Sequence, residues 1–172
     1  MMIIWITGLS GSGKTTLAKN LIYKLSKKLK KKTIHIDGDN FRNIFNDLGH
    51  NLKDRKINAE RVSKLVNLIN KNLNVLIIVS LLSISQKWLN WNKKNNKGYF
   101  QIFLDVHINT LRKRNIRKIY SNKKDVVGVH IKYRKPLNNY IVIKNDFKKK
   151  TFNQISKKIL QNKIINQYLK SL

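Results

Sequence analysis

The sequence contains no cysteine and a single proline, Pro136. Without cysteine, disulfide bonds and metal sites built on thiolates are excluded. No uninterrupted apolar run approaches the roughly 20 residues that a membrane-spanning helix needs, so we expect no membrane partner. The first apolar run begins at Met2 or Ile3, which leaves no room for a signal peptide and predicts a cytoplasmic location.

Acidic residues are also scarce. Eight Asp and Glu stand against 37 Lys and Arg, for a formal net charge of +29. Such a charge attracts polyanions. The lysines are spread along the whole chain, however, together with many Asn and Ile residues, which favours a compositional bias over nucleic-acid binding. Any carboxylate chemistry must come from a short list: Asp37, Asp39, Asp47, Asp54, Glu60, Asp105, Asp125 and Asp146.

The apolar pattern predicts an α/β fold. With 172 residues, 41% of them hydrophobic, the chain fits one domain spanning 1–172. Buried strands are predicted over 2–7, 33–36, 75–79, 99–104 and 140–143, and helices over 15–30, 40–45, 53–72, 83–96, 110–120 and 151–169. This alternation predicts three layers, α/β/α, around a five-stranded parallel sheet. Ligands then bind at the carboxyl ends of the strands.

The most informative stretch follows the first strand and precedes the first helix. It has the G-x-x-x-x-G-K-[ST] pattern of a phosphate-binding loop, whose backbone N–H groups surround phosphate oxygens. Lys14 is then expected to reach the β- and γ-phosphates of ATP, and the Thr15 hydroxyl to ligate Mg²⁺. A glycine-rich turn with a solvated lysine is disfavoured, because pattern, strand and helix agree. The predicted ATP-binding residues are Gly8, Leu9, Ser10, Gly11, Ser12, Gly13, Lys14, Thr15 and Thr16.

Two of the eight acids, Asp37 and Asp39, follow the second predicted strand directly. Phosphoryl transfer needs a carboxylate near the phosphates, to orient Mg²⁺ or to accept the proton of the attacking hydroxyl. The third strand ends in Ser80, where many phosphate-loop enzymes have an aspartate, and this raises the importance of Asp37 and Asp39. The alternative is a polar turn in which an aspartate caps the next helix, a role that Asp39 could combine with ligand binding.

The chain resembles the adenylyl-sulfate kinase (APS kinase) family. The similarity runs in order along nearly the whole chain, and its Asp-Gly-Asp-Asn-x-Arg and Asp-Arg-x-x-Asn-x-x-Arg segments are far more specific than the phosphate loop. The matching segments are 8–18, 36–42, 47–49, 54–61, Tyr120, 126–129 and 141–143.

This resemblance implies a P-loop kinase that transfers the γ-phosphate of ATP to the 3′-hydroxyl of adenylyl sulfate, a step of sulfate assimilation. It implies ATP and Mg²⁺ as cofactors, a lid over about 112–135, and a possible homodimer. The implied catalytic residues are Lys14, Asp37 and Asp39, with Thr15 and Asp37 at the metal. The implied substrate-binding residues are Asp39, Arg42, His50, Arg55 and Asn58.

The acceptor side departs from the family pattern. APS kinases typically hold the substrate adenine between two phenylalanines, where this chain has His50 and, in the lid, Val126. Val126 cannot stack on a purine as an aromatic ring does. The lid is also several residues shorter than usual, and 126–129 and Trp91-Asn92 resemble a divergent branch of the family. A related kinase acting on another small alcohol or nucleotide-linked metabolite is therefore an alternative. A nucleotide-binding regulatory or nucleic-acid-binding protein without turnover is a third interpretation, disfavoured by the intact Lys14, Thr15, Asp37 and Asp39.

Basic and histidine side chains complete the candidates. Arg114 and Arg117, in the predicted lid, are expected to stabilise charge on the transferring phosphoryl group, or else to form an ordinary basic helix face. The four histidines show no metal-ligand spacing, and His35, within a predicted strand, is interpreted as structural.

Overall fold

A five-stranded parallel sheet forms the centre of the protein. The computed structural model describes residues 1–122 and 124–171. The strands are β1 (Met2–Gly8), β2 (Thr33–Asp37), β3 (Leu76–Ser80), β4 (Tyr99–Asp105) and β5 (Ile141–Lys144). Their order across the sheet is β2-β3-β1-β4-β5, and every pairing is parallel. The predicted α/β class and five-stranded parallel sheet are confirmed.

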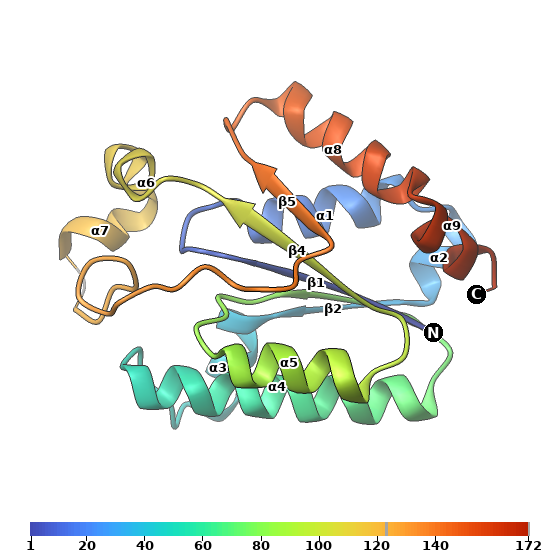
Figure 1. Ribbon diagram of the computed structural model, residues 1–172, viewed down its shortest axis with the longest axis horizontal. Helices are drawn as coiled ribbons and strands as arrows, with labels where there is room; N and C mark the ends of the chain where they lie inside the picture. Colours follow the sequence, from blue (N-terminus) through green and yellow to red (C-terminus); the bar gives the residue numbers. More distant parts are fainter. Residues whose placement is uncertain (123, 172) are drawn as a thin grey trace.

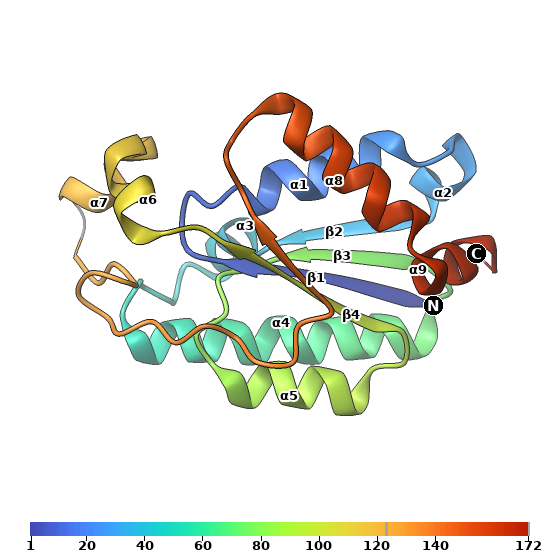
Figure 2. The same cartoon turned by 45° about the horizontal axis from the view of Figure 1, so that its top comes forward.

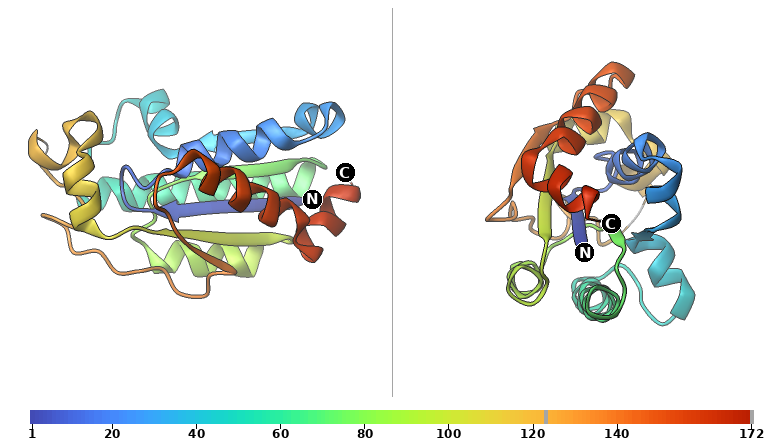
Figure 3. Two further views of the ribbon diagram at one scale, coloured as in Figure 1. Left: turned by 90° about the horizontal axis from the view of Figure 1, so that it is seen from above. Right: turned by 90° about the vertical axis from the view of Figure 1, so that its right-hand side faces the viewer.

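Helices cover both faces of this sheet. On one face lie α1 (Lys14–Lys24) and α8 (Lys149–Gln161), with α2 (Lys27–Lys31) and α9 (Lys163–Lys170) at their far end (Figure 1). The other face is covered by α4 (Leu52–Asn72) and α5 (Gln86–Asn95), with α3 (Gly38–Phe45) beside α4 (Figure 2). Figure 3 shows the three layers end-on. The predicted three-layer arrangement is therefore confirmed.

Each face of the sheet has its own hydrophobic core, because side chains alternate along a strand. Met2, Ile4 and Ile6 of β1 pack with α1, α8 and α9, whereas Ile3 and Trp5 pack with α4 and α5. All five side chains are almost fully buried. The almost continuous apolar run of β1 is thus explained by burial on both faces.

Three predicted helices are interrupted, and a polar residue, Ser26, Asn115 or Asn162, lies at each interruption or directly after it. The predicted helix 15–30 breaks at Leu25, which is extended, and Ser26 then caps α2 by accepting a bond from the Leu29 N–H. The predicted helix 110–120 breaks at Asn115, which is left-handed. The predicted helix 151–169 breaks at Asn162, whose side chain caps α9. Local side-chain bonds to the backbone compete with helix continuation at such residues, so these three predictions of continuous helices were wrong.

The carboxyl ends of the strands meet at one edge of the sheet. Gly8, Asp37, Ser80 and Asp105 are the last residues of their strands, and Asp37 is in register with Ser80. Above this edge lie α6 (Ile108–Arg114), the 3₁₀ helix η1 (Ile116–Lys118) and α7 (Ile119–Asn122) (Figure 1). Within 1–122 and 124–171, no helix combines the length and the apolar character needed to cross a membrane.

Candidate active site

The phosphate loop connects β1 to α1 and has little room for side chains. Gly13 has a φ of 98°, and a Cβ atom there would lie 2.7 Å from Cζ of Phe152. Glycine is therefore required by both backbone conformation and space. The Asn145 amide, which follows β5, donates a 2.8 Å hydrogen bond to the Ser12 carbonyl and fixes the loop from the opposite side.

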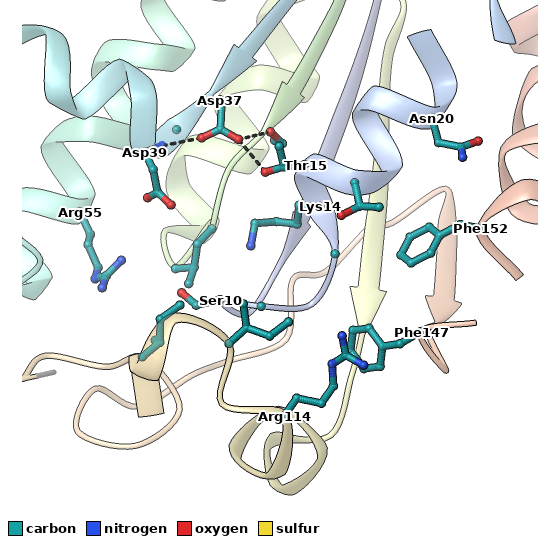
Figure 4. Close-up of a pocket in the computed structure, with 18 residues that line it drawn as sticks. Ser10, Lys14, Thr15, Asn20, Asp37, Asp39, Arg55, Arg114, Phe147 and Phe152 are labelled. Carbon is teal, nitrogen blue, oxygen red and sulfur yellow. Dashed lines mark hydrogen bonds between the residues drawn. The ribbon is translucent and has the colours of Figure 1, made fainter. Parts of the chain in front are cut away.

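A cavity of about 560 Å³ opens beside this loop, at the carboxyl edge of the sheet (Figure 4). Its lining combines most of the residues predicted for the site with several that were not predicted. The predicted ones are Ser10, Gly11, Gly13, Lys14, Thr15, Thr16, Asp37, Asp39 and Arg55. Gly8, Leu9 and Ser12 form the supporting turn, where Leu9 and Ser12 are buried.

Lys14 lies at the centre of the cavity, between the aspartates and the loop (Figure 4). Its Nζ atom donates a 2.9 Å hydrogen bond to the Leu9 carbonyl. Burial lowers the pKa of Lys14 to about 8, although the nearby Asp39 and Asp37 act in the opposite direction. The protein itself therefore compensates the charge on this ammonium poorly, and a bound phosphate would stabilise it.

Asp37 accepts four hydrogen bonds. Its Oδ2 atom accepts from the hydroxyls of Thr15 at 2.7 Å and Ser80 at 2.9 Å. Its Oδ1 atom accepts from the backbone N–H groups of Asp39 and Asn40, so Asp37 is also the N-cap of α3. Burial alone would raise the pKa of Asp37, but these bonds outweigh burial and hold the pKa below its usual range. An aspartate thus caps this helix, but the cap is Asp37 and not Asp39, the residue considered from the sequence.

The Thr15–Asp37 pair fits an Mg²⁺ ion. The Thr15 hydroxyl hydrogen points to Asp37, which leaves the oxygen lone pairs of Thr15 for another partner. Mg²⁺ binds through few protein oxygens and completes its shell with phosphates and water. In the part of the chain that the structure describes, no group of three or more His, Asp or Glu residues could hold a metal. Such an ion would therefore depend on Thr15, Asp37 and the nucleotide.

On the acceptor side, Arg42 and Asp39 form a pair of unequal exposure. The Arg42 side chain is only 7% exposed and that of Asp39 is 75% exposed, with 3.3 Å between Arg42 Nη1 and Asp39 Oδ1. Nη1 also lies 3.2 Å from His50 Nδ1. Arg42 Nε has no hydrogen-bond partner among the described residues. Asp39 therefore offers an accessible carboxylate beside a fixed guanidinium.

Arg55 joins the two segments in which the family's phenylalanines were expected. Its Nε atom donates to the His50 carbonyl at 2.6 Å, and its Nη2 atom donates to the Asp125 carbonyl at 3.2 Å. Burial and the nearby Arg42 lower the pKa of Arg55. Val126, next to Asp125, is only 3% exposed. This position therefore presents no surface on which a purine could stack.

Asn58 has a supporting contact in this region. It is 1% exposed, and its amide donates a 3.1 Å hydrogen bond to the Gly38 carbonyl, between the two aspartates. Asn58 is not part of the cavity lining. The substrate contact expected of Asn58 stays a prediction, and the structure shows a side chain that holds the Asp37–Asp39 turn.

Comparison with known proteins identifies the family. The family model described as adenylylsulphate kinase matches residues 1–144. The chain belongs to this family. A cytidine diphosphoramidate kinase of Campylobacter jejuni is 34% identical over 139 residues, covering 78% of this chain and 81% of that protein. An adenylyl-sulfate kinase of Clostridium acetobutylicum is 31% identical over 172 residues, covering 95% and 85%.

A solved structure confirms the fold of this family member. The APS kinase of Mycobacterium tuberculosis, in complex with AMPPNP and APS, superposes with a TM-score of 0.77 at 23% identity, covering 92% of this chain and 95% of that one. These relatives are kinases, and the chain is a phosphotransferase. The predicted family and enzyme class are confirmed, and the relatives differ in the acceptor that their names state.

One end of the cavity is formed by Arg114, which was expected from the sequence, and by three residues that sequence reasoning missed, Phe147, Asn20 and Phe152. The Arg114 guanidinium lies 3.7 Å from the centre of the Phe147 ring (Figure 4), and Asn20 and Phe152 line the same end of the cavity. Phe147 comes shortly after β5, so the rule that strand ends build the site could have indicated it. The Arg117 side chain lies outside the described part of the structure.

The predicted lid of the kinase contacts the phosphate loop directly. The Tyr120 hydroxyl of α7 donates a 2.6 Å hydrogen bond to the Ser10 carbonyl. Burial raises the pKa of Tyr120 to about 12, so this hydroxyl keeps its hydrogen at neutral pH. Arg55 and Tyr120 thus attach the 112–135 segment to both sides of the cavity.

Proposed function

We propose that this kinase transfers the γ-phosphate of ATP to a hydroxyl of a nucleotide-linked, anionic acceptor. The observation that supports this most strongly is the arrangement around one cavity. The phosphate loop with Lys14 and Thr15 forms one wall, and Asp37, Asp39 and Arg55 form the wall that faces it. Charge-assisted contacts from Arg55 suit the anionic oxygens of such an acceptor.

The residues divide the chemistry among them. The N–H groups of the loop and Lys14 hold the phosphates of ATP, and a bound Mg²⁺ would neutralise charge on the β- and γ-phosphates. Asp37, with its acceptor sites occupied by four donors, orients the Thr15 hydroxyl. The exposed Asp39 accepts the proton as the acceptor oxygen bonds to phosphorus and the bond between phosphorus and ADP breaks.

Two acceptors are proposed for test. Adenylyl sulfate is the acceptor that the family's description names, and its product would be 3′-phosphoadenylyl sulfate. Cytidine diphosphoramidate, named for the Campylobacter jejuni relative, is favoured by the acceptor side. With a buried Val126 in place of one phenylalanine and the smaller His50 ring in place of the other, an adenine ring loses much of its stacking surface. Stacking contributes about 1–3 kcal/mol per base where proteins bind single strands, so a smaller pyrimidine loses less.

A coupled assay for ADP tests the proposal. Wild-type protein is supplied with ATP, Mg²⁺ and either adenylyl sulfate, cytidine diphosphoramidate or a plain alcohol such as gluconate. We expect turnover with a nucleotide-linked acceptor, none with gluconate, and loss of turnover in Lys14→Ala. Lys19→Ala, on the outside of α1, is the matched control and should keep full activity. Turnover with gluconate alone, or with no acceptor, would overturn the proposal.

A further inference from the structure

His35 and Ser80 form a chain of hydrogen bonds that ends at Asp37. The Nε2 atom of His35 lies 3.0 Å from Oγ of Ser80, and the Ser80 hydroxyl donates to Oδ2 of Asp37 at 2.9 Å. The three residues occupy neighbouring positions on β2 and β3, where Asp37 is directly in register with Ser80. The half-buried His35 is thus joined to the cavity.

The hydrogen count determines the direction of this chain. A serine hydroxyl has one hydrogen, and an ionised carboxylate can only accept. The hydrogens of Thr15 and Ser80 both point to Oδ2 of Asp37, so the Ser80 oxygen can only accept from His35. Nε2 of His35 must therefore carry a hydrogen. Each group donates to the next, from His35 through Ser80 to Asp37.

Ser80 also occupies a distinctive place in the fold. Many phosphate-loop enzymes have their metal-orienting aspartate at the end of the strand next to the phosphate-loop strand, and here that strand, β3, ends in Ser80. The carboxylate comes instead from Asp37 on β2, one strand further out. Ser80 bridges this gap, because its hydroxyl lies between the imidazole of His35 and the displaced carboxylate.

We propose that His35 and Ser80 are positioning residues, which hold the Asp37 carboxylate in the orientation that Thr15 and Mg²⁺-bound ATP require. This inference rests on the proposed function. Oδ2 of Asp37 faces the Thr15 hydroxyl at 2.7 Å, and among the residues that the structure describes Ser80 is the other donor to that oxygen. Without Ser80 the carboxylate keeps its backbone bonds through Oδ1, but Oδ2 is free to turn away from the phosphate loop.

The first test measures the binding of a fluorescent ATP analogue as Mg²⁺ is titrated. Outer partners of metal ligands typically change metal affinity by about 10-fold or more when lost. We expect Ser80→Ala and His35→Ala to raise the Mg²⁺ concentration at half-saturation about 10-fold. Analogue affinity in EDTA should not change, because the loop and Lys14 are untouched. Ser80→Thr keeps a hydroxyl, and His35→Gln keeps a hydrogen-bond donor. Both variants should therefore retain most of the wild-type Mg²⁺ response.

A matched control separates this role from general support of the strand. Thr33 lies on the same side of β2, two residues before His35, and its hydroxyl donates to the Leu29 carbonyl at 2.6 Å. Thr33→Val loses one hydrogen bond without touching Asp37 and should leave the Mg²⁺ response unchanged. Equal Mg²⁺ responses in Ser80→Ala and wild type, or equal losses in Ser80→Ala and Thr33→Val, would overturn the proposal.

A second test reads the hydrogen bond itself, without any acceptor substrate. A long-range ¹H–¹⁵N spectrum of protein labelled at histidine should show His35 with its hydrogen on Nε2, assigned by its loss in His35→Gln. In Ser80→Ala the Nε2 shift should move toward that of a solvated imidazole. A hydrogen on Nδ1 alone would contradict the chain. Failure of all acceptors in the kinase assay would refute only the proposed function, because neither of these measurements uses an acceptor.

Discussion

Asp37, at the end of β2, and Asp39, two residues later, have different environments. Asp37 is half-buried and accepts four hydrogen bonds, whereas Asp39 is exposed beside Arg42. We expect Asp39→Asn to lower kcat about 100-fold or more, because a general base contributes about 10²–10⁴-fold, with Mg²⁺-ATP binding unchanged. Asp37→Asn should mainly weaken Mg²⁺-dependent ATP binding. Steady-state kinetics and ATP titration distinguish the two variants, with Asp47→Asn as the control. A loss of Mg²⁺-ATP binding in Asp39→Asn, with a loss of kcat alone in Asp37→Asn, would refute the division of roles.

Lys14 makes the binding of metal-free ADP depend on pH. Its pKa is about 8 in the free protein, and bound phosphate raises it, because phosphate stabilises the charged ammonium. Binding is then strongest where Lys14 is already charged, below pH 8. Above pH 8 the dissociation constant should rise, by up to about 10-fold per pH unit. Calorimetry between pH 7.5 and 9.5 measures this dependence.

Lys14→Arg provides the control for that titration. Arginine stays charged throughout this range, so the variant should bind ADP more weakly but with little dependence on pH. An equally steep rise in the variant would assign the titration to another group.

Among the elements, α4 is joined through Arg55 to Asp125, in the segment predicted to be a lid. Arg55 lies in α4. Its side chain donates to the carbonyl of His50, which precedes this helix, and to the carbonyl of Asp125, far along the chain. Arg55→Ala removes both bonds, so we expect faster amide exchange around Asp125 and an acceptor KM raised about 10-fold, since hydrogen bonds to charged groups contribute about 1.5–3 kcal/mol. Lys56→Ala, on the next and exposed position, is the control. Unchanged exchange near Asp125 would contradict this role.

The strands and the donor side of the site could be predicted from the sequence because their signals are local. The phosphate loop is one continuous motif, and buried strands are continuous apolar runs. Helix ends were less predictable, because Ser26, Asn115 and Asn162 interrupt apolar periodicity without Gly or Pro.

Other parts of the site depend on contacts between distant residues. Two contacts join segments that are far apart in the chain: the Arg114 guanidinium lies over the Phe147 ring, and Arg55 donates to the Asp125 carbonyl. The sequence near each arginine does not indicate its partner. The His35–Ser80–Asp37 chain depends on the register of β2 and β3, which becomes visible only in the sheet. His35, interpreted from the sequence as structural, is accordingly the residue whose contacts changed its interpretation most.

For the whole molecule, the net charge of +29 predicts that salt stabilises the fold. Eight acids can neutralise only a small part of 37 basic side chains, and the remaining charges repel one another in the compact state. Salt shortens the range of this repulsion, from about 10 Å at 0.1 M to about 3 Å at 1 M. We expect Tm to rise by about 3–6 °C between low and high NaCl, which corresponds to about 1–2 kcal/mol.

Scanning calorimetry at several NaCl concentrations measures this effect, and sorbitol of equal osmolality is the uncharged control. A Tm that is constant or falls with NaCl would show that the basic side chains lie too far apart to repel. The expected homodimer stays a prediction, to be checked in the same buffers by sedimentation.

The layer formed by α1, α2, α8 and α9 has a consequence for handling the protein. Residues 1–36 and 147–172, which include these four helices, contain no Asp or Glu, so all eight acids lie between Asp37 and Asp146. These two stretches carry 15 Lys and Arg and no acid to offset them, which is +15 of the formal net charge of +29. A negatively charged sensor chip will therefore attract this layer at low ionic strength, and added salt will weaken that attraction.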